Sequence, residues 1–490
     1  MNRKSLALVA LFVFAVAPVA LTETDTVLLL HTNDLHDHAR PGYDGQGGLP
    51  YVAGYIQQVR SERPDTLLLD GGDVTEKGDM VAFASKGVLM YEAMGRIGYD
   101  AGVPGNHDWA YGGIPHLRKC AAAAKGMDML CANILGDGPE PLFPASKVYD
   151  VDGVKVGVIG LARPGSGGDL VLDRCAEVLA KEAAALEPEV HLLVVVCHYG
   201  SRDCIAFSRQ VPAIDVFVSG HTHELLAEPV VVSATGARIV QAGDFARYVG
   251  RLELTIDLDT KEVVQANGEV VPMMHDKVSC DEGMLAWIHE QEQALCPQAT
   301  RVVGRCDAAV IRANVGCLVA AALRAHGMGD VGFCSPKQVL RGNLPLGVID
   351  VNALFVTGGQ RGHTVVRTEL TGAQIEGYLR FLADGRLTEW AGFQADVKPA
   401  KAPKIPVVET TLEPTAAYSV ILTEREWESE MTRFLKTLPD GPKPESAVCP
   451  FTFTEALTAY VLPLTAQDIP IDAHVKVLAE AQELQTALVP

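Results

Sequence analysis

Five short polar clusters hold the side chains of this sequence that are best suited to chemistry. Each cluster closely follows an apolar run, where a buried strand would end at the carboxyl edge of a sheet. Carboxylate, imidazole and carboxamide groups together form a mixed nitrogen and oxygen ligand set that zinc, manganese or iron accept. The clusters are Asp34-Leu35-His36, Asp70-Gly71-Gly72-Asp73, Gly105-Asn106-His107-Asp108, Cys197-His198 and Gly220-His221-Thr222-His223.

The spacing within two clusters suggests how their ligands would meet. Asp34 and His36 are two residues apart, and so are His221 and His223. In extended backbone, side chains two residues apart point the same way, so we expect each pair to converge. One such pair is more often a hydrogen-bonded turn than a metal site. Five clusters at successive strand ends favour a shared metal centre.

Neighbouring residues have simpler interpretations. Asp37 and His38 form a second Asp/His pair, which we expect to be solvated in a loop. Cys197 follows an apolar run, which predicts a buried and inert thiol. The 11 cysteines show no CxxC spacing, which argues against a structural zinc ribbon. Their odd number predicts that at least one is free or pairs between chains.

Apolar runs alternating with helical stretches between Thr26 and Leu258 predict an α/β fold with buried sheets covered by helices. A second region begins near Arg301. Within it, Trp427 could equally be a core residue or an aromatic surface on which a substrate stacks. In the first region the predicted strands are Thr26–Leu30, Thr66–Leu69, Val154–Ile159, His191–Val196 and Ile214–Val218. In the second we predict helices over Asn314–His326 and Thr371–Leu382 and strands over His363–Thr368 and Tyr418–Thr423.

Composition limits the class of protein. A chain of 490 residues suits two domains with large cores, and 48% hydrophobic residues exclude a disordered chain. The formal net charge of −20 argues against nucleic acid or an anionic membrane surface as a partner. An anionic substrate would therefore need local attraction, such as bound cations.

The amino terminus resembles an export signal. A basic start is followed by the apolar run Leu6–Ala17 and small residues up to Ala20. We predict that residues 1–22 are a signal peptide and that the protein is periplasmic or extracellular, or tethered to the membrane if the segment is retained. No other segment approaches 18 uncharged apolar residues, so we expect no other stable membrane insertion.

The clusters together resemble the five motifs of the calcineurin-like metallophosphoesterases. The opening HTNDLH at residues 31–36 and the appended second region are similar to the secreted 5′-nucleotidase branch. The resemblance implies a four-layer α/β/β/α sandwich with a second, smaller α/β domain at the carboxyl terminus. The implied boundaries are a signal at 1–22, a catalytic domain at 23–262, a connector and hinge at 263–300, and a carboxyl-terminal domain at 301–490.

The same resemblance implies two divalent metal ions and hydrolysis of a small phosphoester, such as a nucleotide, by a metal-bound hydroxide. Two such ions outweigh two carboxylates and leave local positive charge for a phosphate. His107 would stabilise the transition state or protonate the leaving group, and Asp70 would lie behind the ligands. Asp34, His36 and His223 would hold one metal, Asn106, His198 and His221 the other, and Asp73 would bridge them.

This sequence departs from the family pattern in both regions. Ala110 replaces the aspartate that usually orients the catalytic histidine, so Asp108 or another carboxylate would have to substitute. The aromatic residues that stack on a base are missing from the second region, which removes about 1–3 kcal/mol of stacking per base. Arg312, Arg341 and Arg361 remain as candidates to bind a substrate phosphate or carboxylate.

Two alternatives stay open. A scaffold protein with a degenerate substrate pocket would explain Ala110 and the divergent second region, although seven intact ligand positions argue against it. A thiosulfohydrolase-like enzyme, which cleaves sulfate from a protein-bound carrier, would keep the fold and change the bond. Those relatives lack the asparagine of the Gly-Asn-His motif, and here Asn106 is present.

Overall fold

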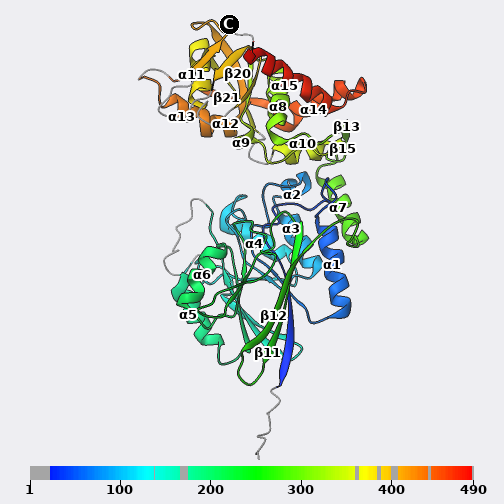
Figure 1. Ribbon diagram of the computed structural model, residues 1–490, viewed down its shortest axis with the longest axis vertical. Helices are drawn as coiled ribbons and strands as arrows, with labels where there is room; N and C mark the ends of the chain where they lie inside the picture. Colours follow the sequence, from blue (N-terminus) through cyan, green and yellow to red (C-terminus); the bar gives the residue numbers. More distant parts are fainter. Residues whose placement is uncertain are drawn as a thin grey trace, which may run out of the picture.

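The computed structural model describes residues 23–136, 138–165, 175–358, 364–382, 388–398, 407–439 and 443–487. It contains two α/β domains, which Figure 1 shows stacked along the long axis of the molecule. Among the described residues, no helix has both the length and the apolar character needed to cross a membrane. The predicted signal at residues 1–22 and Arg361 lie outside the described residues.

The first domain contains two six-stranded sheets. In the first sheet the strand order is β12-β11-β1-β2-β3-β4, with β1 to β4 parallel and the β11–β12 hairpin joined to β1 in the antiparallel direction. Its strands are β1 (Thr24–Thr32), β2 (Leu67–Asp70), β3 (Ala101–Gly102), β4 (Asp128–Met129), β11 (Tyr248–Asp257) and β12 (Val263–Pro272).

The second sheet has the order β5-β6-β7-β8-β10-β9. Strands β6, β7, β8 and β10 are parallel, and β5 and β9 close the two edges in the antiparallel direction. Its strands are β5 (Ser146–Val151), β6 (Val154–Leu161), β7 (Leu192–Cys197), β8 (Val216–Ser219), β9 (Val230–Val231) and β10 (Arg238–Val240).

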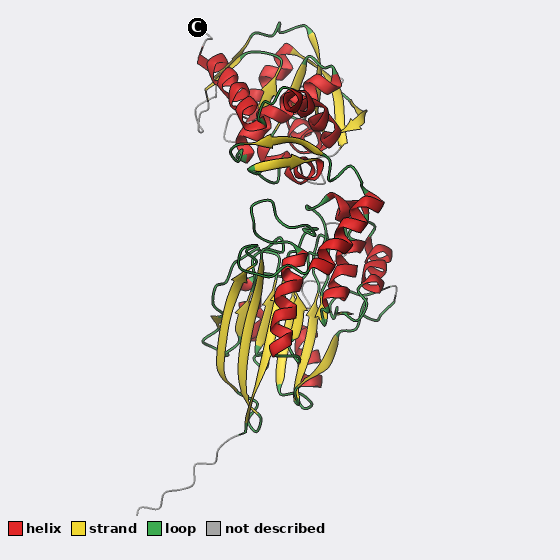
Figure 2. Ribbon diagram, turned by 90° about the vertical axis from the view of Figure 1, so that its right-hand side faces the viewer, coloured by secondary structure: helices red, strands yellow, loops and turns green. Residues whose placement is uncertain are grey.

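Alternation of side chains along the strands builds the layers. Val27 and Leu29 of β1 pack in the core between the two sheets, whereas Leu30 packs beneath helices on the outer face. Ile159 of β6 packs beneath the helices on the opposite outer face. The predicted four-layer α/β/β/α sandwich is therefore confirmed (Figure 2). The covering helices are α1 (Leu49–Glu62), α2 (Met80–Ala84), α3 (Val88–Ile97) and α4 (Gly113–Ala123) on one side, and α5 (Cys175–Leu186) and α6 (Ser201–Gln210) on the other.

The second domain is built on a five-stranded sheet with the order β17-β14-β20-β16-β21. One core cluster lies between this sheet and α11, and α8 and α14 cover the other face. The strands are β13 (Val302–Cys306), β14 (Val331–Cys334), β15 (Gly347–Asp350), β16 (Thr364–Thr371), β17 (Glu389–Ala391), β18 (Ala395–Lys398), β19 (Val407–Thr410), β20 (Ala417–Thr423) and β21 (Ser446–Thr452). The helices are α8 (Arg312–Gly327), α9 (Pro336–Val339), α10 (Val351–Gly358), α11 (Gly372–Leu382), α12 (Glu424–Glu426), the π-helix η3 (Trp427–Met431), α13 (Thr432–Leu435), α14 (Phe453–Ala466) and α15 (Ile471–Ala487).

The segment between the domains differs from the sequence prediction. Strand β12 belongs to the first sheet, so this sheet continues past the boundary predicted at residue 262. Most β12 side chains are at least partly exposed, because β12 is an edge strand, and the segment therefore lacks the apolar run that marks a buried strand. Helix α7 (Glu282–Leu295) buries Trp287 and Ile288 in the same core as α1. The hinge role of residues 263–300 stays a prediction.

Polar contacts join the two domains near α2 and α10, which lie side by side in Figure 1. Asp350 accepts hydrogen bonds from Arg40 (2.9 Å) and from the hydroxyl of Tyr43 (2.6 Å). Asn352 donates to Asp79 (2.8 Å) and accepts from the backbone N–H of Met80 (2.7 Å). The start of α10 is thereby attached to loops of the first domain.

Candidate metal centre

The loops that follow four parallel strands meet where the two sheets of the first domain end. Thr32 and Asp70 are paired at the ends of β1 and β2, and Cys197 and Ser219 are paired at the ends of β7 and β8. The loops after β2 and β7 connect the two sheets, because Nδ1–H of His198 donates to the carbonyl oxygen of Gly71 at 2.7 Å. The five polar clusters of the sequence lie in these loops and in the loop after β3.

One group of possible metal ligands consists of Asp34, His36 and His223, whose ligand atoms all lie within 4.8 Å of one another. The Nε2 atoms of His36 and His223 are 3.2 Å apart and lie 3.7 and 3.3 Å from Oδ1 of Asp34. Nδ1 of His36 instead contacts the carbonyl oxygen of Thr75 (3.1 Å), and Nδ1 of His223 contacts the carboxylate of Asp244 (2.7 Å). Such outer contacts fix the imidazole ring and leave Nε2 to face a metal.

A second group consists of Asp73, His198 and His221. Oδ2 of Asp73 lies 3.0 Å from Nε2 of His198 and 3.7 Å from Nε2 of His36, so this carboxylate stands between the two groups. The sequence also predicts Asn106 as a ligand. Its Oδ1 is buried and has no hydrogen-bond partner in the described part of the chain, which suits an oxygen that binds a cation.

The electrostatics of the two groups suit divalent cations. Burial lowers the pKa of His36 well below its usual value and that of His221 to about 4, so both imidazoles are neutral near pH 7. Burial alone would raise the pKa of Asp73, but the imidazoles of His198 and His36 hold it below its ordinary value. Burial lowers the pKa of His198, but the carboxylates of Asp73 and Asp34 raise it to about 9, so a metal that binds there would displace a proton from this imidazole.

The backbone of the predicted ligands is left-handed rather than extended. The φ angles are 53° at Asp34, 48° at His36, 58° at Asp73, 82° at His221 and 57° at His223. Asp34 and His36 do converge, but through these turns and not through extended backbone. His221 and His223 lie in the two neighbouring groups, one in each, as the family resemblance implied. Left-handed non-glycine residues are unfavourable, and they concentrate at functional sites.

Buried carboxylates hold these loops in place. Asp70 accepts hydrogen bonds from the hydroxyl of Thr32 (2.6 Å) and from the backbone N–H of Gly72 (2.9 Å) in the loop after β2. Asp37 accepts from the backbone N–H of Glu76 at 2.7 Å and is fully buried, so the prediction that it is solvated is wrong. Its side chain has a structural partner, which its position after the first cluster did not reveal. His38 is half-buried.

Asp108 does not take the place of the missing aspartate beside His107. Its two oxygens accept hydrogen bonds from the backbone N–H groups of Gly105 (2.7 Å), Asp73 (3.0 Å) and Thr75 (3.0 Å). The backbone N–H of His107 in turn donates to Oδ1 of Asp73 at 2.7 Å. Asp108 therefore shapes the loops around Asp73.

Sequence reasoning missed three residues near the site. Glu76 contacts Nδ1 of His107, and Nζ of Lys77 lies 3.2 Å from Nε2 of His36. Neither residue follows an apolar run, so no sequence signal marked them. Asp244 follows β10 within a Gly-Asp-Phe turn, and the signal used for the other clusters could have identified it.

The second domain contributes one predicted residue near the metal groups. The pKa of Lys77 is lowered by burial and also by the positive charge of Arg341, which places that arginine within electrostatic reach of the centre. Arg312 is exposed at the start of α8, where its backbone N–H donates to Asn343 at 2.7 Å. Trp427 packs against the core of the second domain and is not an exposed platform.

The cysteines have no part in either group. All 11 are free thiols, as their odd number and spacing allowed. Cys197 is fully buried, and its hydrogen bond with Cys204 together with burial raises its pKa well above the usual value. This agrees with the prediction of an inert thiol beside His198.

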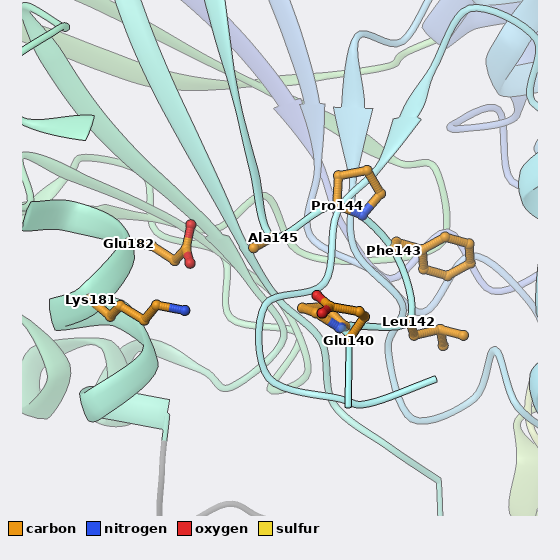
Figure 3. A pocket seen from close by; sticks show the side chains of 8 residues that line it. Glu140, Leu142, Phe143, Pro144, Ala145, Lys181 and Glu182 are labelled. Atoms are coloured by element: carbon orange, nitrogen blue, oxygen red, sulfur yellow. The ribbon is translucent and has the colours of Figure 1, made fainter. Parts of the chain in front are cut away.

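A surface hollow between the loop of residues 140–145 and α5 lies apart from the metal groups (Figure 3). Lys181 and Glu182 of α5 line one side of it. Glu182 accepts a hydrogen bond from the hydroxyl of Ser146, which gives this acid a structural role. None of the predicted site residues lines this hollow.

Comparison with known proteins agrees with this geometry. The model of the calcineurin-like phosphoesterase family matches residues 27–225. The 5′-nucleotidase of Mus musculus is 28% identical over 324 residues, which cover 56% of this chain and 54% of that protein. The chain thus spans about half the length of the curated relatives it matches.

Solved structures resemble both domains. A 5′-nucleotidase precursor from Thermus thermophilus has a TM-score of 0.69 at 23% identity, and the match covers 90% of this chain and 97% of that one. A sulfate thiohydrolase from the same organism has a TM-score of 0.65 at 19% identity, with 89% and 94% covered. These likenesses show the fold of the two-domain chain. Residues 27–225, with two groups of possible metal ligands at their strand ends, match the calcineurin-like phosphoesterase family.

Proposed function

We propose that this chain is an exported phosphohydrolase of 5′-nucleotidase type that hydrolyses small phosphate esters with two divalent cations. The observation that carries the proposal is the position of Asp73, whose carboxylate stands between the imidazoles of His36 and His198. One acidic group shared by two ligand groups is the arrangement that a two-metal centre requires.

The residues fit two cations. Asp73 would bridge them, and the buried, unpartnered Oδ1 of Asn106 supports its assignment as a ligand. Bound cations would polarise the phosphoryl oxygens and activate a water molecule near neutral pH. We assign Asp34, His36 and His223 to one cation and Asn106, His198 and His221 to the other.

His107 would act on the reacting phosphate. Its ring lies edge-on to the ring of His36, with centroids 5.0 Å apart, and its backbone is tied to Asp73. From that position it would donate a hydrogen bond to charge that develops in the transition state, or a proton to the leaving oxygen. Lys77 and Arg341 would attract further anionic groups of the substrate.

Metal analysis of the purified protein, with hydrolysis of p-nitrophenyl phosphate, AMP and UDP-glucose in the presence of Mn²⁺, tests this proposal. We expect about two metals per chain and phosphate release that His107→Ala reduces by about 100-fold or more. A protein with no affinity for Mn²⁺ or Zn²⁺ would indicate a scaffold instead. A metal-loaded protein that releases sulfate from thiosulfate esters but no phosphate would indicate a thiosulfohydrolase.

Export rests on the sequence of residues 1–22 and needs its own test. We expect the full-length chain, expressed in a bacterial host, to appear in the periplasmic or extracellular fraction. A variant with Leu6–Ala17 deleted should remain in the cytoplasm. Equal distribution of both proteins would contradict export without affecting the proposed chemistry.

A further inference from the structure

His107 has a carboxylate partner that comes from a different loop than the family pattern implies. The carboxylate of Glu76 contacts Nδ1 of His107, and the two side chains are 7% and 17% exposed. Ala110 stands three residues after His107, and its backbone N–H donates to the carbonyl oxygen of His107 at 3.1 Å. The turn that would carry an aspartate is therefore formed, but it carries only a methyl group.

The backbone around Glu76 is fixed by contacts with two loops. Its own N–H donates to Asp37 in the loop after β1, at 2.7 Å. The N–H of Thr75 donates to Asp108 at 3.0 Å, and its hydroxyl donates to the carbonyl oxygen of His107 at 3.2 Å. The φ angle of Glu76 is 71°, a left-handed conformation that these contacts hold. Glu76 is thus directed at His107 by a constrained loop.

We propose that Glu76 is the positioning residue of His107 and replaces the carboxylate that is absent at Ala110. By accepting a hydrogen bond from Nδ1–H, the carboxylate of Glu76 fixes the orientation and the tautomer of the imidazole. Nε2 is then the ring nitrogen available to the substrate, as in other enzymes where a buried carboxylate orients a catalytic histidine. The inference rests on the proposed phosphohydrolase function.

Steady-state kinetics of Glu76→Gln on the substrate that wild-type protein hydrolyses best would test the role. Glutamine keeps the volume and removes the charge, so kcat should fall at least about tenfold while KM and metal content stay within about twofold. Glu76→Asp, which keeps the carboxylate on a shorter side chain, should lie between Glu76→Gln and the wild type. The same change at Glu92, a partly exposed residue of α3 that pairs with Arg96 one turn later, serves as the control.

Rescue separates positioning from a structural role. The double variant Glu76→Gln/Ala110→Asp returns a carboxylate to the turn after His107 and should recover at least about threefold in kcat over Glu76→Gln. A Glu76→Gln protein with unchanged kcat, or one whose loss follows lost metal or lost folding, would overturn the inference, as would a double variant without recovery. An inactive wild-type protein would instead contradict the proposed function, so the two failures can be distinguished.

Discussion

Both domains bury carboxylates, but the groups that surround these carboxylates differ between the domains. In the second domain Glu426 is fully buried, and its oxygens accept hydrogen bonds from donors of the protein itself. Ser335 donates from its backbone at 2.8 Å, and the hydroxyls of Thr388 and Tyr378 donate at 2.9 and 3.0 Å. Burial nevertheless raises the pKa of Glu426 to about 7. This cluster holds the second domain together and offers nothing to a ligand.

The candidate metal centre of the first domain has the opposite character. Asp73 lies among imidazoles, Asn106 keeps a buried oxygen without a protein donor among the described residues, and the ligand backbones are left-handed. A buried carboxylate therefore indicates a binding site when its neighbours are other ligands and unsatisfied atoms, and a structural role when its neighbours are donors. The following predictions test that distinction.

The largest effect should come from Asp73→Asn. The change keeps the shape but removes the charge that stands between the two ligand groups, so we expect loss of at least one metal and a fall in kcat of about 1,000-fold or more. Metal analysis and kinetics would measure both quantities. Glu426→Gln should keep its metals and its activity. If both variants lost metal equally, the distinction between the two clusters would fail.

The two groups of possible metal ligands could be predicted from the sequence because the signal is local. Parallel strands end at a common edge, so polar residues after apolar runs come together whatever the intervening loops do. All five runs predicted in the first domain contain strands, and residues that follow four of them form the two ligand groups. The helix predicted over Thr371–Leu382 is present as α11, and the hydroxyl of Thr371 accepts a hydrogen bond from the backbone N–H of Gln374 at 3.2 Å.

What the sequence could not provide depends on contacts between distant loops. Glu76 and His107 are 31 residues apart, and no periodicity links them. The burial of Asp37 follows from its bond to Glu76, and the strand character of β12 follows from its pairing with β11. Left-handed backbone at non-glycine residues cannot be inferred from residue type, because the surrounding contacts impose it.

The next effect should be on thermal stability. A cation that binds only the folded state stabilises it by about 4 kcal/mol at about 1,000 times its dissociation constant, which corresponds to roughly 10 °C in Tm. We expect Mn²⁺ or Zn²⁺ to raise, and a chelator to lower, the first unfolding transition in scanning calorimetry. Glu426→Gln should show the same shift and Asp73→Asn a much smaller one. A shift that Asp73→Asn retains in full would mean that the metal binds elsewhere.

A smaller effect should appear in the pH dependence of stability. The pKa of Glu426 is raised from 4.5 to about 7, so the unfolded chain loses this proton at lower pH than the folded chain does. Stability from this group is therefore complete below about pH 4.5 and falls by up to about 3 kcal/mol as the pH rises to about 7. Urea unfolding between about pH 5 and about pH 8, followed by tryptophan fluorescence, should show this decline in the wild type and a flatter profile in Glu426→Gln. Equal pH dependence of stability in the wild type and in Glu426→Gln would contradict the assignment of this decline to Glu426.

The smallest effect should come from Arg341→Gln, which tests whether the second domain contributes to the site at all. Arg341 is exposed and acts through its charge near Lys77, so its loss should raise KM about tenfold and leave kcat and metal content nearly unchanged. Arg433→Gln, at an exposed arginine that contacts Glu430 within the second domain, is the matched control. An unchanged KM in Arg341→Gln would confine substrate binding to the first domain. A raised KM would show that the second domain binds substrate through surface charge, whereas the buried carboxylate of Glu426 bonds only to donors of its own domain.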